Sequence, residues 1–197
     1  MEITWKNGFE IFLMIKYDIP KDHHCLLHAV MMAFFNPYIT EQFNGVHISK
    51  LQIITNLRYE LSEKLAQPVK GVSGPNHYDI LNNGNTSKFS LSVPEFKLHN
   101  MMNKLKSNEH IGYGYFEFIN NQLNKDIYIL DAKTQDLYQT DEYKYSIKGR
   151  NSIVLLYIEN KEDEHLNHYD LIGINGVTHF KPNNPFILFL KSKIRFT

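Results

Sequence analysis

The segment Asp22–Val30 reads Asp-His-His-Cys-Leu-Leu-His-Ala-Val, and its apolar character continues as far as Phe35. Ile19-Pro20 interrupts regular structure just before it, so the pattern predicts a short helix that starts at Cys25 and is apolar on almost every side. Such a helix is buried all round, and the rest of the fold must pack around it. Cys25 would lie in its first turn, where unpaired backbone N–H groups and the positive end of the helix dipole favour a thiolate.

Charge and cysteine content restrict the classes of function. The 197 residues are 43% hydrophobic, enough for one core, and 21 basic residues balance 21 acidic ones. Because there is no excess of positive charge, we expect no nucleic-acid partner. Cys25 is the single cysteine, which excludes an internal disulfide and a Cys-rich zinc site and is typical of a reducing compartment. Cys25 is therefore either a small buried hydrophobe or a functional thiol.

No part of the sequence predicts membrane insertion or secretion. The longest apolar run, residues 29–35, is far shorter than the about 20 residues that cross a bilayer. The first residues carry acids where a signal peptide has a basic start, and internal repeats and long linkers are absent. We therefore expect one domain over residues 1–197, located in the cytoplasm and monomeric.

The elements beyond the central segment change character along the chain. Leucines and isoleucines recur every three or four residues from Leu51 to Leu65, which predicts an amphipathic helix with Ser49 as its N-cap and Pro68 as its stop. A further helix is predicted from Pro94, with Leu98, Met101, Met102 and Leu105 on one stripe, and residues 69–92 have the composition of a long surface loop.

The second half of the chain predicts a sheet. A helical piece over residues 115–123 is followed by strands at Asp126–Asp131, Ser152–Ile158 and Tyr169–Ile174, and Asn175-Gly176 predicts a hairpin turn into Val177–Phe180. Because the helices come first and the strands follow, the order predicts an α+β fold with helices packed on a small, mostly antiparallel sheet.

Two histidines are candidates for a base that would activate Cys25. His77 and His168 stand in the same sequence, Asn-His-Tyr-Asp, so each has a carboxylate two residues later. In a strand, residues i and i+2 lie on one face about 6.5 to 7 Å apart, close enough for the aspartate to hold the imidazole. His168 enters a predicted strand, whereas His77 lies among turn-forming residues. We therefore predict His168 as the base, with Asp170 orienting it, and His77 as an exposed loop histidine.

These residues resemble a known family. Asp22–Val30 resembles the nucleophile motif of the ovarian tumour (OTU) cysteine proteases, Asp-Gly-Asn-Cys-Leu-Phe-Arg/His-Ala-Ile/Val, and residues 168–170 resemble their His-Tyr-Asp/Asn element. Leu57-Arg58, Ile111–Ile119 and Lys125–Leu130 resemble the family's Leu-Arg helix, its Trp-Gly segment and its first strand. The resemblance runs in the right order over roughly residues 18–175.

The resemblance implies a papain-like OTU fold and a deubiquitinating activity. Cys25 would be the nucleophile, His168 the general base and acid, and Asp170 the residue that orients His168. Asp22 would shape the loop before the nucleophile, with His23 and His24, where backbone N–H groups complete the oxyanion hole. The substrate would be the isopeptide bond at the C-terminal glycine of ubiquitin or a ubiquitin-like protein, and no metal or organic cofactor is implied.

The sequence also departs from the family pattern. His23 and His24 replace a glycine and an asparagine, and glycine reaches backbone dihedrals that a residue with Cβ resists. The family's tryptophan is absent from residues 111–114. An altered oxyanion loop would suit a second hypothesis, in which the chain is a catalytically weak or inactive OTU-like module that binds ubiquitin or a host factor.

The residues leave three other interpretations open. A protease of ordinary peptide chains would use the same triad. His23, His24, Cys25 and His28 include zinc-type ligands, although no second ligand pair accompanies them. The charge run from Glu159 to Glu164 is either a solvated loop or a contact for the arginines of the ubiquitin tail.

The abundance of Asn, Lys, Ile, Tyr and Phe is typical of AT-rich coding sequence. This composition suggests a virus or intracellular microbe as the source and hence the host cytosol as the location.

Overall fold

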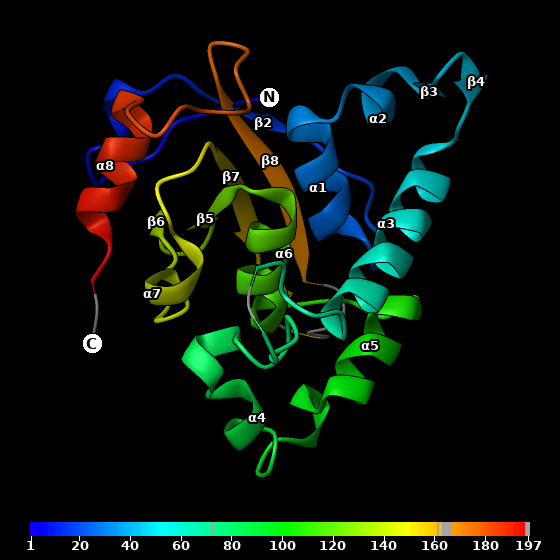
Figure 1. Ribbon diagram of the computed structural model, residues 1–197. Helices are drawn as coiled ribbons and strands as arrows, with labels where there is room; N and C mark the ends of the chain where they lie inside the picture. The colour runs from blue at the N-terminus through cyan, green and yellow to red at the C-terminus, as the bar shows by residue number, and fades with distance from the viewer. Residues whose placement is uncertain (72, 161, 163–166, 196–197) are drawn as a thin grey trace.

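The computed structural model describes residues 1–71, 73–160, 162 and 167–195, and it contains one main sheet with helices on both faces (Figure 1). The strands are β1 (Glu2–Ile3), β2 (Met14–Tyr17), β3 (Gln42–Phe43), β4 (Val46–His47), β5 (Asp126–Asp131), β6 (Asp136–Leu137), β7 (Ser152–Ile158) and β8 (His168–Ile174). The helices are α1 (Cys25–Phe34), α2 (Asn36–Thr40), α3 (Lys50–Leu65), α4 (Thr86–Phe89), α5 (Leu98–Lys106), α6 (Phe116–Leu123), α7 (Tyr143–Ser146) and α8 (Pro185–Lys193). Short 3-10 turns occupy Phe9–Ile11, Leu81–Gly84, Pro94–Phe96 and Tyr113–Tyr115.

The main sheet has the strand order β1-β2-β8-β7-β5-β6. All neighbouring strands are antiparallel except β5 and β7, which run parallel from the pair Asp126↔Ser152 to the pair Asp131↔Tyr157. Strands β3 and β4 form a separate hairpin on the arm that also carries α2 (Figure 1). The mostly antiparallel α+β fold predicted from the sequence is confirmed.

Both faces of the sheet are buried, and alternate strand residues divide between two cores. Ile153 and Leu155 of β7 face the core that contains α1, whereas Val154 and Leu156 face the core that contains α8. Strands covered on both sides carry continuous apolar runs, as β5 does over residues 127–130 and β7 over residues 153–158. In Figure 1 the sheet accordingly lies between α1 on one side and α8 on the other.

The central helix has the burial that its sequence predicts. Eight of the ten residues of α1 are buried, including Cys25 and His28, and the helix packs directly on β8. α3 also begins and ends close to its predicted bounds, because the Ser49 side chain accepts a hydrogen bond from the backbone N–H of Gln52 at 3.2 Å and so caps the helix.

Residues 69–92 are not simply a surface loop, and this prediction is wrong in part. The segment contains α4 and the turn Leu81–Gly84, and it buries Tyr78 and Leu81 in the core beside α1. Asn82 and Asn83 adopt positive φ angles of 56° and 53°, which asparagine tolerates better than most residues. A composition rich in Asn and Gly thus produced compact turns rather than an open loop.

Two other predictions differ in their bounds. The helix expected from Pro94 is interrupted at Lys97, whose extended backbone separates the turn Pro94–Phe96 from α5. Asn175-Gly176 forms the expected turn, with φ values of 50° and 78°. The segment Val177–Phe180 makes only isolated bridges, Ile174↔Val177 and Ser152↔Phe180, instead of a full strand.

The two ends of the chain contribute elements that the sequence pattern did not reveal. β1 and β2 add the N-terminal segment to the sheet beside β8, and α8 covers the second face. An aromatic cluster joins these ends, because the ring of Phe9 contacts Trp5 at 5.5 Å and Phe189 at 5.0 Å between centroids. Within the described ranges, none of the helices has the length and apolar character needed to cross a bilayer.

Replacing Leu155 by alanine tests the central position of β7. Leu155 is fully buried, so Leu155→Ala should lower the free energy of unfolding by about 2–5 kcal/mol through lost burial and a residual cavity. The matched control is Leu188→Ala on α8, whose side chain is 51% exposed and whose loss should cost less than about 0.5 kcal/mol. Urea unfolding followed by circular dichroism measures both, and equal losses would contradict this description of the core.

Candidate active site

The packing of α1 on β8 brings the single cysteine next to the predicted base. Cys25 is the first residue of α1 and is fully buried. Its sulfur lies 3.9 Å from the backbone carbonyl oxygen of Asn167, which is 142 positions away in the chain and immediately precedes His168. The start of a helix and the start of a strand thus meet at the thiol.

His168 and Asp170 form the contact that the strand geometry predicts. They are the first and third residues of β8, they lie on one face, and the His168 Nε2 atom is 2.9 Å from Asp170 Oδ1. Both residues are buried. Because Asp170 occupies Nε2, the nitrogen left to interact with the sulfur is Nδ1.

The proton on this imidazole is held strongly. The hydrogen bond with Asp170 and then the one with the Cys25 side chain raise the pKa of His168 to about 9, while burial acts in the opposite direction. At neutral pH the ring is therefore protonated and places a positive charge beside the sulfur. Cysteine hydrolases rely on this juxtaposition of imidazolium and sulfur to obtain a nucleophile.

Asp170 is held by two groups besides His168 that sequence reasoning missed. The backbone N–H of Ile19 donates to Asp170 Oδ1 at 3.0 Å, and Lys16 Nζ donates to Oδ2 at 3.1 Å. Burial tends to raise the pKa of Asp170, but the hydrogen bonds from His168, Ile19 and Lys16 outweigh it, and the net direction is downward. The carboxyl therefore stays ionised.

Lys16 was not a candidate because it lies outside the region of family resemblance. It belongs to β2, a strand of four residues that pairs with β8 and places Lys16 opposite Ile172. Lys16 also pairs with Asp18, and the hydrogen bond to Asp18, followed by that to Asp170, raises its pKa against the effect of burial. Only the pairing of β2 with β8 reveals this residue.

The loop before the nucleophile is organised by Asp22. One carboxylate oxygen of Asp22 accepts the backbone N–H of His24 at 2.8 Å, and the Asp22 carbonyl accepts the N–H of Cys25 at 3.2 Å. His23 is exposed and does not adopt a positive φ. The replacement of the family's glycine by His23 is therefore accommodated without the backbone strain that a Cβ would cause in the left-handed region.

His24 is fixed by a buried arginine. Arg58 Nη1 lies 3.2 Å from His24 Nδ1, and the same guanidinium donates to the carbonyls of Leu105 and Glu109, each at 2.9 Å. Burial, followed by the charge of Arg58, lowers the pKa of His24. Arg58 belongs to the Leu-Arg pair of the resemblance, but its contact with the loop was not predicted.

The other Asn-His-Tyr-Asp sequence, residues 76–79, does not form a histidine–aspartate pair. His77 Nδ1 is 3.1 Å from the amide nitrogen of Gln122, and its ring packs on Phe118. The Asp79 carboxylate instead accepts the backbone N–H of Asn76 at 2.9 Å. His77 is half-buried, so its prediction as an exposed histidine is wrong, whereas its separation from an orienting aspartate agrees with the choice of His168.

The metal hypothesis finds no matching arrangement of ligands. His24 contacts Arg58, and His28 contacts Tyr38 and Asp22. In the part of the chain that the structure describes, no three His, Cys, Asp or Glu side chains are grouped to hold a metal ion.

The charge run Glu159–Glu164 is described only in part, because residues 161, 163 and 164 lie outside the described residues. Glu159 pairs with Lys133 at 2.9 Å.

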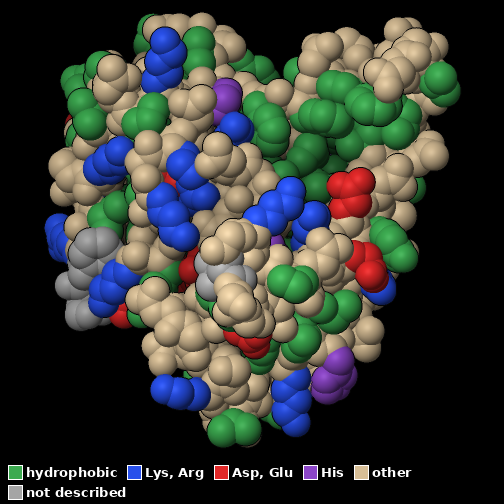
Figure 2. Space-filling model, in the orientation of Figure 1, with side chains coloured by type: hydrophobic (Ala, Val, Ile, Leu, Met, Phe, Trp, Pro, Cys, Tyr) green, Lys and Arg blue, Asp and Glu red, His purple; other side chains and the backbone are tan. Residues whose placement is uncertain are grey.

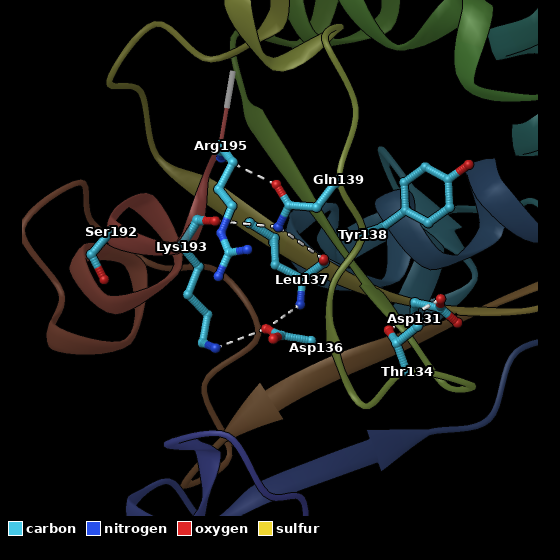
Figure 3. A pocket seen from close by; sticks show the side chains of 9 residues that line it. All are labelled: Asp131, Thr134, Asp136, Leu137, Tyr138, Gln139, Ser192, Lys193 and Arg195. Carbon is cyan, nitrogen blue, oxygen red and sulfur yellow. Dashed lines mark hydrogen bonds and ion pairs between the residues drawn. The ribbon is translucent and has the colours of Figure 1, made fainter. Parts of the chain in front are cut away.

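Two larger hollows lie away from this site. A polar pocket of about 510 Å³ is formed by β6, residues 138–139 and the end of α8. Figure 3 shows Lys193 paired with Asp136, and the Gln139 side chain donating to the Lys193 carbonyl and accepting the backbone N–H of Arg195. An apolar groove of about 360 Å³ lies beside Phe34 and Phe35, at the end of α1 opposite Cys25. Hydrophobic side chains are visible there between the body and the arm (Figure 2).

Comparison with solved structures relates this arrangement to known proteins. No family model matches the chain, and no curated protein matches it in sequence. An OTU domain solved in complex with ubiquitin superposes with a TM-score of 0.55 at 19% identity, over 95% of this chain and 87% of that chain. The chain therefore has the fold of an OTU domain, as the sequence resemblance predicts.

Two further OTU structures are similar at lower scores. The OTU domain of OTUD1 has a TM-score of 0.46 at 15% identity, with 81% of this chain and 85% of that chain covered. An OTU deubiquitinase from Wolbachia pipientis wMel has a TM-score of 0.43 at 9% identity, with coverage of 90% and 96%.

The pKa of His168 provides a direct test of the Asp170 contact. In Asp170→Asn the neutral amide no longer stabilises the imidazolium, so the pKa of His168 should fall from about 9 towards its usual value near 6.5. Titration of the ring signals by NMR measures the change, with His77 as an internal control whose pKa should not move. An unchanged pKa of His168 would contradict the assigned hydrogen bond.

Proposed function

We propose that the chain is a cysteine-type ubiquitin hydrolase that cleaves isopeptide bonds at the C-terminal glycine of ubiquitin or a ubiquitin-like protein. The observation that carries the proposal is the meeting of Cys25, at the start of α1, with the His168–Asp170 pair at the start of β8. The OTU fold supports the same class of reaction, because one OTU domain of this fold was solved with ubiquitin bound. Fold alone does not determine substrate, so the triad geometry has the greater weight.

The geometry suits acyl transfer through a thioester. The Cys25 sulfur attacks the glycine carbonyl, and the negative charge that develops on the oxygen is received by backbone N–H groups at the start of α1 and in the loop before it. His168 donates its proton to the departing lysine amine, and the C–N bond breaks. His168 then takes a proton from water, and the hydroxide attacks the thioester carbonyl. The C–S bond breaks, which releases the glycine carboxyl group and returns the Cys25 thiolate beside the protonated His168.

The ionised Asp170 keeps His168 in the orientation that this cycle needs. With Nε2 held by the carboxylate, Nδ1 is the nitrogen that exchanges the proton with sulfur, amine and water in turn. Because Lys16 and the Ile19 N–H also hold the carboxylate, Asp170 cannot rotate away without losing two further hydrogen bonds. Asp170 is thus a positioning residue rather than a proton carrier.

Substitution of the triad tests the proposal with a ubiquitin that bears a C-terminal electrophile and with a fluorogenic ubiquitin substrate. Cys25→Ala should abolish both reactions, and His168→Ala should lower turnover by about 10³-fold or more, because it removes the general base and acid. Asp170→Ala should cost less than His168→Ala, since it weakens the orientation and the protonation of His168 but leaves the proton carrier in place. His77→Ala is the matched control and should leave turnover within twofold of the unsubstituted protein.

The same experiment separates the alternatives. If the unsubstituted chain forms no adduct but still binds ubiquitin, it is a binding module with the OTU fold. If it cleaves ordinary peptides and ignores every ubiquitin-like probe, the substrate class is wrong although the triad is right. Equal losses in His77→Ala and His168→Ala would contradict the choice of base.

The pH profile provides an independent test of His168 as the general acid. Because the pKa of His168 is about 9, kcat/KM should remain high through neutral pH and fall as the pH rises past this value, when the imidazolium is lost. In Asp170→Asn this alkaline decline should begin at a lower pH, since the imidazolium is less stable. A decline that stays in place in Asp170→Asn would assign it to another group.

A further inference from the structure

His28 of α1 lies one helical turn after Cys25 and contacts the loop of residues 22–25 that precedes and includes the nucleophile. His28 is 2% exposed and surrounded by the apolar residues of α1, yet both of its ring nitrogens have partners. Its Nδ1 atom is 2.8 Å from the hydroxyl of Tyr38, and its Nε2 atom is 3.2 Å from Asp22 Oδ2. Tyr38, from α2, is also buried.

The chemistry of the partners fixes the direction of these hydrogen bonds. An ionised carboxylate accepts only, so Nε2 carries the hydrogen and donates to Asp22. Nδ1 of the neutral ring then accepts the Tyr38 hydroxyl hydrogen. Burial lowers the pKa of His28 despite the nearby Asp22, and burial raises the pKa of Tyr38 to about 12, so both groups are neutral at physiological pH.

Asp22 connects His28 to the backbone of residues 24 and 25. While one of its carboxylate oxygens contacts His28, the other accepts the N–H of His24 at 2.8 Å, and its carbonyl accepts the N–H of Cys25 at 3.2 Å. The Asp22 side chain is 40% exposed, so water competes for it on its outer side. The buried His28 and Tyr38 hold it from the core.

We propose that His28, supported by Tyr38, is a positioning residue that holds Asp22 and thereby keeps the loop of residues 22–25 in the shape that receives the oxyanion. This inference rests on the proposed function for its kinetic consequence. A leucine at position 28 would fill an apolar helix face without a desolvated polar ring, so the structure assigns the ring a role that packing does not require.

The decisive comparison is between His28→Leu and His28→Gln. Leucine removes the hydrogen bond to Asp22, whereas the glutamine amide nitrogen can still donate it. In His28→Leu we expect kcat on a fluorogenic ubiquitin substrate to fall at least tenfold with KM within twofold, and affinity for ubiquitin C-terminal aldehyde, whose adduct carries the oxyanion, to fall by a similar factor. His28→Gln should recover most of both, and Tyr38→Phe should have a smaller effect than His28→Leu.

Two controls separate loop shape from general damage. Alkylation of Cys25 by iodoacetamide needs the sulfur but no oxyanion site, so its rate in His28→Leu should stay within twofold of the unsubstituted chain. His179→Ala, which removes a half-buried histidine packed on Phe34, should leave kcat unchanged. If alkylation and turnover fall together in both His28 variants, or if kcat does not change in His28→Leu, the positioning role is wrong.

An NMR measurement tests the same contacts without any substrate. The nitrogen shifts of His28 should identify the neutral tautomer with hydrogen on Nε2, and the amide of His24 should exchange slowly in the unsubstituted chain and at least tenfold faster in His28→Leu. The opposite tautomer or unchanged exchange would overturn the inference. Because this readout is independent of ubiquitin, a chain that is inactive on ubiquitin but shows both signals refutes the proposed function and leaves the anchorage of the loop established.

Discussion

The packing of α1 against β8 is the contact on which the whole site depends. It buries an apolar helix against an apolar strand, so the hydrophobic effect drives it, and the polar groups at the two ends are carried along. Cys25 and His168 are each the first residue of their element, which places both at the same rim of the core. The residues that bury α1 therefore also set the distance between thiol and imidazole.

Much of this arrangement follows from periodicity that is visible in the sequence. The all-apolar pattern after Cys25, the three-four spacing of α3, the alternation of Ile127 and Ile129 in β5 and the apolar run of β7 predicted the elements that carry the core. Burial on particular faces imposes those patterns. The spacing of His168 and Asp170 predicted their contact for the same reason, since a strand brings residues i and i+2 to one face. Local rules were sufficient wherever both partners lie in one element.

Contacts between distant elements could not be predicted in this way. Lys16 reaches Asp170 only because β2 pairs with β8, and a strand of four residues leaves too short a pattern to identify from sequence. Arg58 and His28 likewise look like ordinary positions on helices until α3 and α2 are placed around the nucleophile loop. The missed contacts share one property: each is a hydrogen bond between residues of different elements or loops, and hydrogen-bond partners have no periodicity.

The charges around the site explain why the N-terminal segment is needed. A buried Asp170 beside one imidazolium would serve either as its counter-ion or as an uncompensated charge once His168 gives up its proton. Lys16 and the Ile19 N–H also donate to the carboxylate, and neither of these hydrogen bonds involves the His168 proton, so Asp170 keeps a cation and a donor when His168 is neutral. The proton on His168 can then move without disturbing the residue that orients the ring. On this argument β2 does more than extend the sheet, because it supplies the cation that lets a buried carboxylate serve both protonation states of its histidine.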